Sequence, residues 1–399
     1  MSRSKRWGLA SAAVLAAVSA AILATTAAGG GSAKKPIVIG VAMDLSSQMS
    51  PYDTPALYMA QARASQINAK GGVLGRKIVF NICNTQLKKQ QECAAQLIAQ
   101  GAVVGMVTCD VEYAAPSTQE FIDHGMLALA PCIGTDQQGP KRFGAKGRLA
   151  FTFGSPAQEE GAAMAEYSYS RGWRKAIIVK DNLLAYFKDI ADAFEYRFKQ
   201  LGGTIVDHQQ FTSFDGTINT VASKVAAEKA DVICFGTAFA DLPTFVAGVR
   251  SLGDKTPIIN SWGGDGNYWW PSNPKVTNYY YVTYGSIYGH DPSKLVNSLV
   301  RQVTRQNGGH LPATGSFVPG ADLIDGLVAA IKQTGGTNGL KLANAFEHFR
   351  GLPVTSGKIT FTKNLHSVTG RAFRVMRVQN NHAEFLRLWK TKKSAVISE

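Results

Sequence analysis

The sequence predicts an α/β protein made of two lobes, each built around a doubly wound parallel sheet. Apolar strand-like runs alternate with helical patterns at a regular pitch from Lys35 onward, and this alternation is typical of a parallel sheet with helices on both faces. The alternation starts again after about residue 154. The chain has 399 residues, which is too many for one ordinary hydrophobic core. We therefore expect two lobes of the same kind.

The first lobe is expected to open with a strand, a helix and a second strand. Leu57, Ala60 and Ala64 fall on one face of a 3.6-residue period, and Gly71 and Gly72 can end this helix in the left-handed conformation. Two further strands follow. The expected elements are strands 37–43, 77–83, 103–108 and 126–130, with helices that begin near residues 55, 90 and 116.

The second lobe repeats the pattern and is followed by a mixed tail. Its expected elements are helix 158–170, strand 176–180, helix 185–201, strand 204–208, helix 218–228, strand 232–235, helix 242–252 and strand 257–260. After a strand at 279–284 come helical patterns at 294–306, 321–332 and 340–349, then short strands at 357–361, 372–378 and 385–389. We expect no third domain from such a tail.

The N-terminus has the order of a secretory signal peptide. Arg3, Lys5 and Arg6 precede an apolar run at 9–23, and small residues extend to Ala28. A run of about 15 apolar residues is shorter than the ~20 that a spanning helix needs. We therefore expect residues 1–28 to be removed rather than to anchor the chain. Because no cysteine lies near this point, a soluble periplasmic protein is favoured over a lipid-anchored one.

The chain is basic, with a formal net charge of +14. Lysines and arginines are scattered along it, and no basic helix with interleaved aromatic residues appears. An exported, solvated surface therefore explains the charge better than nucleic-acid binding does. No segment after the signal peptide is apolar enough to cross a bilayer.

Five cysteines occur, and an even subset of them should pair in an oxidising compartment. Cys83 ends the second strand and Cys93 lies one loop later, while Cys109 and Cys132 follow consecutive strands that should lie side by side. This spacing favours the pairs Cys83–Cys93 and Cys109–Cys132 and leaves a Cys83–Cys109 pair open. Cys234 is expected to be a buried thiol. We expect no metal site, because no C-x-x-C spacing occurs.

The segment 67–76, Ile-Asn-Ala-Lys-Gly-Gly-Val-Leu-Gly-Arg, closes a helix and leads at once into a strand. It resembles the opening of the periplasmic solute-binding proteins of the branched-chain amino acid class, which are leucine-binding-protein-like and have the type I periplasmic binding fold. The resemblance implies three crossings between the lobes, near Gly154, Tyr284 and Pro353. It thus implies an N-terminal lobe of 36–154 plus 284–353, a C-terminal lobe of 155–283 plus 354–390, and a tail at 391–399.

Open α/β sheets bind ligands outside the carboxyl ends of their strands, where loops and helix N-termini expose N–H groups. The candidate ligand contacts are therefore polar and aromatic residues that follow each strand. In the first lobe they are Ser46, Ser47, Asp110, Tyr113, Cys132, Ile133 and Thr135. In the second lobe they are Asn182, Tyr186, Asp241, Trp262 and Asp265.

The resemblance implies roles for some of these residues. The loop 131–135, Pro-Cys-Ile-Gly-Thr, matches a loop that holds a ligand carboxylate, with one extra residue. Asp241 falls where an acid meets the ligand's ammonium group, and Tyr186 falls where the family has an aromatic contact. The chain departs from the family at 109–113, Cys-Asp-Val-Glu-Tyr, which replaces a serine-rich turn, and at Ala321, which replaces a tyrosine.

Structural roles are also open for the same residues. Asp110 and Asp241 can cap the helices that follow them, Thr135 can be a plain turn residue, and most of the aromatic cluster at 262–281 can be core and hinge packing. If Asp110 and Glu112 instead face the cleft, a cationic or polyhydroxylated solute fits better than a zwitterion, because an unpaired buried carboxylate is costly.

Enzyme motifs are missing from the sequence. No G-x-G-x-x-G follows the first strand, and neither a G-x-S-x-G elbow nor a phosphate-binding P-loop occurs. We therefore predict no enzyme and no cofactor.

We predict instead a monomeric periplasmic protein that closes on a small polar organic solute. The solute would be an amino acid or a related amide, amine or aromatic acid, and the protein would deliver it to an inner-membrane ABC permease. A ligand-sensing receptor domain of the same fold, which reports to a membrane signalling partner, is the alternative. An exported enzyme on this scaffold is a third possibility.

Overall fold

The computed structural model describes residues 34–397. The predicted signal peptide, residues 1–28, lies outside the described residues, as does the end of the predicted tail at 391–399. From Lys35 onward the chain forms one compact unit. Within the described part of the chain, no helix is long and apolar enough to span a lipid bilayer.

The first sheet has five parallel strands in the order β2-β1-β3-β4-β5. They are β1 (Ile37–Met43), β2 (Ile78–Asn84), β3 (Val104–Val107), β4 (Leu127–Ala130) and β5 (Ala150–Thr152). The connecting helices are α1 (Ser50–Asn68), α2 (Gln90–Ala99), α3 (Val111–Asp123) and the short α4 (Pro140–Phe143). β1 and β3 consist almost wholly of buried residues, as expected for parallel strands covered on both faces.

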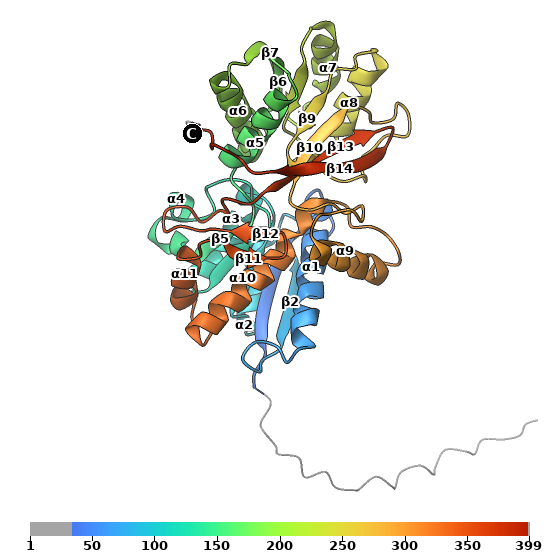
Figure 1. The fold of residues 1–399 in the computed structure, drawn as a ribbon. Helices are drawn as coiled ribbons and strands as arrows, with labels where there is room; N and C mark the ends of the chain where they lie inside the picture. Colours follow the sequence, from blue (N-terminus) through green and yellow to red (C-terminus); the bar gives the residue numbers. More distant parts are fainter. Residues whose placement is uncertain (1–33, 398–399) are drawn as a thin grey trace, which may run out of the picture. The chain divides into compact units, whose positions relative to one another are not determined.

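The second sheet has seven strands in the order β14-β13-β10-β9-β8-β6-β7. They are β6 (Lys175–Asp181), β7 (Thr204–Phe211), β8 (Val232–Phe235), β9 (Ile258–Asn260), β10 (Tyr279–Thr283), β13 (Phe373–Gln379) and β14 (His382–Trp389). The helices are α5 (Ala157–Ser170), α6 (Ala185–Gln200), α7 (Ile218–Ala227) and α8 (Asp241–Ser251). β13 and β14 join as an antiparallel hairpin beside β10, as Figure 1 shows in red.

Three later helices return to the first sheet. They are α9 (Lys294–Gln306), α10 (Pro319–Thr334) and α11 (Gly339–Glu347). α10 packs closely against α1 (Figure 1). A Cβ atom at Gly320 would lie 2.0 Å from the carbonyl oxygen of Ala56, so only glycine permits this approach of the two helices.

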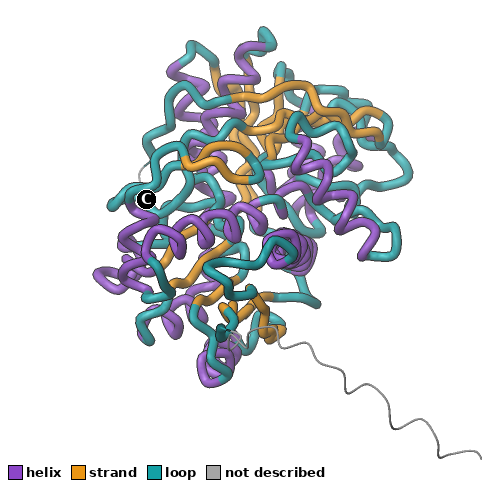
Figure 2. The backbone as a smooth tube through the Cα atoms, turned by 60° about the horizontal axis from the view of Figure 1, so that its bottom comes forward, coloured by secondary structure: helices purple, strands orange, loops and turns teal. Residues whose placement is uncertain are grey.

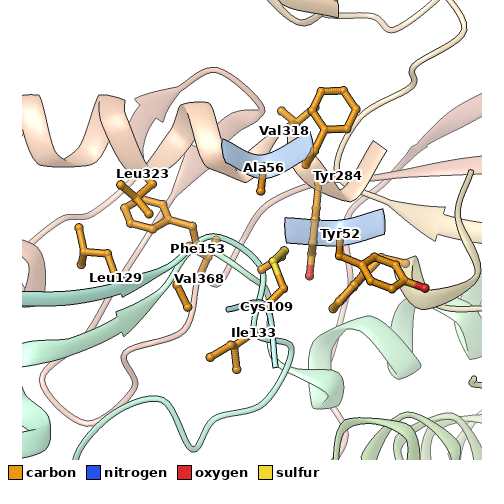
Figure 3. Packing of buried hydrophobic residues seen from close by; sticks show 14 of the residues in the cluster. Tyr52, Ala56, Cys109, Leu129, Ile133, Phe153, Tyr284, Val318, Leu323 and Val368 are labelled. Atoms are coloured by element: carbon orange, nitrogen blue, oxygen red, sulfur yellow. A yellow bond between two sulfur atoms is a disulfide. The ribbon is translucent and has the colours of Figure 1, made fainter. Parts of the chain in front are cut away.

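The segments that cross between the sheets bond to one another. The N–H of Ser155, beyond β5, donates to the hydroxyl of Tyr284, beyond β10, at 3.0 Å. The N–H of Val368 donates to the carbonyl oxygen of Gly154 at 2.9 Å. Figure 3 shows Phe153, Tyr284 and Val368 in one buried cluster. Three neighbouring crossings join two α/β sheets, in agreement with the predicted fold class.

The third crossing differs from the expectation. Residues 354–361, which we expected in the second lobe, lie against helix α10. β11 (Leu352–Val354) and β12 (Gly357–Ile359) form an antiparallel pair. In the loop between them, Thr355 N–H donates to Asp325 at 2.8 Å and Ser356 N–H donates to Asp322 at 2.8 Å. These two carboxylates of α10 hold the segment beside the first sheet. Ser367 still bridges Thr152 of β5, so the chain crosses to the second sheet after Ser367 rather than at Pro353.

Buried side chains form one large apolar cluster and one smaller cluster. The large cluster covers the first sheet and one face of the second. The smaller cluster lies on the opposite face of the second sheet, between its strands and helices α7 and α8. Figure 2 shows helices on both sides of the strands. This layering leaves the carboxyl ends of the parallel strands to form the site.

Candidate ligand-binding site

A cavity lies where the carboxyl ends of the two sheets meet, and the space in it that the centre of a water molecule can reach is only about 20 Å³. The first sheet and its helices contribute Met49, Tyr52, Asp110, Ile133, Gly134 and Thr135. The second sheet and its helices contribute Leu184, Tyr186, Phe187, Phe239, Trp262 and Gly263. Most of these side chains are apolar or aromatic, and a few polar groups converge among them, which is the usual make-up of a small-molecule site.

Asp110 combines the two roles that the sequence left open. Its Oδ1 accepts hydrogen bonds from the N–H groups of Glu112 at 3.0 Å and Tyr113 at 3.1 Å, so it caps helix α3. The same side chain lines the cavity and is 5% exposed. Burial, followed by the neighbouring charge of Glu112, raises the pKa of Asp110 well above its usual value.

Glu160, on helix α5, holds two walls of the cavity. Its Oε2 accepts a hydrogen bond from the hydroxyl of Tyr186 at 2.9 Å, and its Oε1 accepts one from the N–H of Trp262 at 2.7 Å. The rings of Tyr186 and Trp262 stack with centroids 5.0 Å apart. Glu160 is fully buried, and this burial raises its pKa to about 8. The carboxylate therefore fixes both aromatic rings from behind.

Gly134 lets the first sheet's loop approach these rings. A Cβ atom at this position would lie 2.3 Å from the ring of Tyr186 and 3.1 Å from Nε1 of Trp262. Any larger residue would push the loop after β4 away from Tyr186. Close contact between the two halves of the site therefore depends on this glycine.

Tyr52 and Trp262 bring further polar atoms to the cavity. The hydroxyl of Tyr52 donates to the carbonyl oxygen of Gly263 at 2.8 Å and lies 2.9 Å from the hydroxyl of Tyr268. This bond links helix α1 to the loop after β9. Nε1 of Trp262 is buried and has no hydrogen-bond partner. A buried N–H without an acceptor is unusual in a folded protein, so the indole has a donor to offer a ligand.

Both predicted disulfides are present, and the alternative pair Cys83–Cys109 is wrong. Cys109 and Cys132 join the ends of β3 and β4, with Cα atoms 4.8 Å apart. Cys83 and Cys93 join β2 to α2, with Cα atoms 5.5 Å apart. Cys234 is a buried free thiol, as predicted. The Cys109–Cys132 disulfide braces the turn of Asp110 against the loop of Ile133, and Cys109 itself lines the cavity.

Four predicted contacts of the first lobe lie outside the cavity. Ser46 and Ser47 are exposed in a turn that Asp44 holds, since its Oδ1 accepts from the hydroxyl of Ser47 at 2.7 Å. The hydroxyl of Tyr113 accepts a hydrogen bond from Gln48 at 2.8 Å, at the surface. Cys132 is committed to its disulfide. These residues follow strands as expected, but they do not line the cavity.

Three predicted contacts of the second lobe are also outside the cavity wall. Asn182 lies at the end of β6, where its N–H bonds to Phe211. Asp241 opens helix α8 without capping it, because its Oδ2 accepts from the N–H of Phe214 at 2.7 Å. Asp265 is 1% exposed and accepts from Thr283 at 2.6 Å and from Gly315 at 2.7 Å. Both carboxylates accept hydrogen bonds from residues that are distant in the sequence.

The sequence also missed several wall residues. Tyr52 lies in the first turns of helix α1, beyond the loop that follows β1, and Leu184 and Phe187 flank the predicted Tyr186. These three would have been found if the search for residues beyond each strand's carboxyl end had extended into the first turn of the following helix. Phe239 has a positive φ of 58°, which is uncommon for a bulky residue. No sequence pattern predicts this conformation.

The comparisons with known proteins agree with this architecture. Residues 36–383 match the periplasmic binding protein family. The chain belongs to this family. A Leu/Ile/Val-binding protein of Rhizobium johnstonii, BraC3, is 25% identical over 330 residues, which cover 82% of this chain and 87% of that protein.

Solved structures of the family share the fold. The branched-chain amino acid transporter substrate-binding protein LivJ of Streptococcus pneumoniae, in complex with isoleucine, has a TM-score of 0.74 and 19% identity, over 88% of this chain and 99% of its own. An ABC-transporter solute-binding protein of R. palustris, in complex with benzoate, has a TM-score of 0.72 and 17% identity, over 91% of this chain and 98% of its own. The predicted type I periplasmic binding fold is therefore confirmed.

Family membership also bears on chemistry. Like its relatives, this chain is a solute-binding protein and not an enzyme. Within residues 34–397, no group of three or more His, Cys, Asp or Glu side chains is arranged to hold a metal ion.

Proposed function

We propose that this protein is the periplasmic substrate-binding subunit of an ABC importer, and that it binds a small organic solute in the cavity between its two sheets. Relatives named as Leu/Ile/Val-binding proteins support a transport role. The solute would be an amino acid or a related amide, amine or aromatic acid, because neighbours of the same fold hold isoleucine and benzoate. The protein would act as a monomer after loss of residues 1–28.

The proposal rests on one observation: both sheets contribute residues to the cavity wall. Residues that follow β3 and β4 face residues that follow β8 and β9. Tyr52, from the first side, bonds to Gly263, from the second. A solute held by both sides stabilises the closed arrangement of the crossings more than the open one, and a permease can then recognise the closed form.

A binding screen with a shape measurement tests the proposal. Native mass spectrometry of the protein as purified would identify a retained solute. A thermal-shift screen of amino acids, amides, amines and aromatic acids would identify it otherwise. We expect one solute per chain, released unchanged, and a smaller radius of gyration in X-ray scattering when it is bound. Turnover of the solute would contradict the proposal, as would a radius of gyration that stays the same with every solute tested.

A further inference from the structure

The cavity has one carboxylate in its wall, and a second carboxylate follows it outside the wall. Asp110 lines the cavity, and Glu112 follows it in the first turn of α3. Oε1 of Glu112 accepts only a long hydrogen bond of 3.4 Å from the N–H of Ala185. Its Oε2 is buried and has no hydrogen-bond partner. The pair thus retains acceptor capacity beside the cavity.

No counter-charge accompanies these carboxylates. The described wall of the cavity contains no lysine, arginine or histidine. Among residues 34–397, neither Asp110 nor Glu112 takes part in an ion pair. Burial first, and then the charge of Glu112, raises the pKa of Asp110, so the two neighbouring carboxylates cannot both ionise easily. A ligand cation would supply the missing charge.

The rest of the wall suits an organic cation with an apolar body. The rings of Tyr186 and Trp262 stack, and the ring of Tyr52 meets Trp262 edge to face at 5.5 Å. Aromatic faces attract cations and also shield an apolar group from water. Trp262 is 4% exposed and lines the same cavity, and its Nε1–H is buried without a partner. That donor calls for an acceptor on the ligand.

From this arrangement we infer that the solute is an organic cation. Its ammonium group lies against Asp110, with the charge of Glu112 close behind, and its neutral carbonyl oxygen accepts the Nε1–H of Trp262. The inference rests on the proposed function and narrows its solute class. A free α-carboxylate is disfavoured, because the turn that should receive it carries two acids. An amide or ester of an amino acid, or another acyl-bearing amine, has the required groups.

A set of ligands with one skeleton and four charge states tests the inference. Phenylalaninamide is a cation, phenylalanine a zwitterion, N-acetylphenylalanine an anion and N-acetylphenylalaninamide is neutral. The leucine series gives the same four states with an aliphatic body. By isothermal titration calorimetry we expect the cation of at least one series to bind at least about tenfold more tightly than its zwitterion and about a hundredfold more tightly than its anion.

Charge-removing variants assign the effect to the acid pair. Asparagine also caps helices, so Asp110→Asn preserves the fold of α3 while it removes a charge. We expect Asp110→Asn and Glu112→Gln each to weaken binding of the cation by about tenfold or more and to narrow its advantage over the zwitterion. Glu120→Gln, near the far end of the same helix, is the matched control and should leave both affinities unchanged.

The outcomes separate the inference from the proposed function. If the zwitterion or an aromatic acid such as benzoate binds most tightly and Asp110→Asn leaves that affinity unchanged, the inference is wrong and the proposed function stands. Equal binding of all four charge states, unaffected by Asp110→Asn, also overturns the inference, since the acid pair would then act as a neutral hydrogen-bonding group. If no ligand of any charge state binds the folded protein, both fail.

Discussion

The hydroxyl of Tyr186 donates a hydrogen bond of 2.9 Å to the carboxylate of Glu160, and both side chains are buried. The second oxygen of this carboxylate accepts the N–H of Trp262. Glu160 does not line the cavity, yet it sets the positions of the two rings that do. The geometry of the site therefore depends on a residue behind its wall.

Replacement of Glu160 should separate hydrogen bonding from charge. Glu160→Ala leaves the Tyr186 hydroxyl and the Trp262 N–H buried without partners, so we expect a loss of about 2–4 kcal/mol in the free energy of unfolding. Glu160→Gln can still accept from Trp262 and bond to Tyr186, and it should lose less than about 1 kcal/mol. Urea denaturation measures both changes. Equal effects of the two variants would show that the hydrogen bonds do not matter.

Stability should fall as pH rises from about 4.5, the ordinary pKa of a glutamate carboxyl, to about 8. Burial raises the pKa of Glu160 to about 8, and that of Glu159 and of Asp53 to about 7. A carboxyl group whose pKa is higher in the folded protein favours folding at low pH, and this contribution is lost as pH rises through the folded pKa.

The slope of stability against pH identifies the group responsible. Each such group changes the free energy of unfolding by at most about 1.4 kcal/mol per pH unit. Urea denaturation at half-unit steps should give a shallower slope for Glu160→Gln than for the natural protein. If the slope of the variant is unaltered, Glu160 does not titrate in this range.

The two disulfides should differ in their effect on binding. Cys109–Cys132 closes a loop of 23 residues beside the cavity, and Cys83–Cys93 closes one of 10 residues away from it. Loop-closure entropy gives each bond about 3 kcal/mol of stability, so replacing either pair by serine should cost a similar amount. Only Cys109→Ser with Cys132→Ser should also weaken ligand binding, because that bond positions Asp110 and Ile133. The Cys83/Cys93 double variant is the control in calorimetric titrations.

Local patterns in the sequence allowed most of the fold and part of the site to be predicted. Strand and helix periods placed the alternating elements, and sheet order places the ends of consecutive strands together, which led to Asp110, Ile133 and Trp262. The crossing near Ser367 was not predictable in this way. It depends on Asp322 and Asp325 of α10, which accept from a loop about thirty residues further along the chain.

Asp241 and Asp265 have partners in the structure that the sequence did not predict, for a related reason. A carboxylate at a strand end can meet a ligand or a backbone N–H group, and the sequence does not distinguish the two. Here the N–H of Phe214, 27 residues earlier, donates a hydrogen bond to Asp241. The N–H of Gly315, 50 residues later, donates one to Asp265. Such contacts between distant loops are decided by tertiary structure and leave no periodic signal.

Asp241 and Tyr186 can be compared directly. Tyr186 forms part of the cavity wall, so Tyr186→Ala should weaken ligand binding by more than about tenfold. Asp241→Asn keeps the side chain's shape and leaves the cavity unchanged, so affinity should stay within about twofold of the natural protein. Calorimetric titration with the same solute measures both. A large loss of affinity in Asp241→Asn would place Asp241 in contact with the ligand after all.

Arg371 should be essential for the crossings. It is fully buried, and its guanidinium group lies 4.4 Å from the ring centroid of Tyr284 and 3.5 Å from a carboxylate oxygen of Asp322. It also donates to the carbonyl oxygen of Phe153. Arg371 lies in the third crossing segment, contacts the other two and leaves a buried acid behind when removed. Arg371→Met should therefore cost about 3–5 kcal/mol in urea denaturation.

A double variant distinguishes the lost charge from the lost packing. If the cost comes from an unpaired buried carboxylate, Arg371→Met combined with Asp322→Asn should be more stable than the sum of the two single changes allows. Arg387→Ala, at an exposed position over Trp389, should change stability by less than about 0.5 kcal/mol and serves as the control. Strict additivity of Arg371→Met and Asp322→Asn would contradict coupling between them, and Arg371 would then act only through Tyr284 and Phe153.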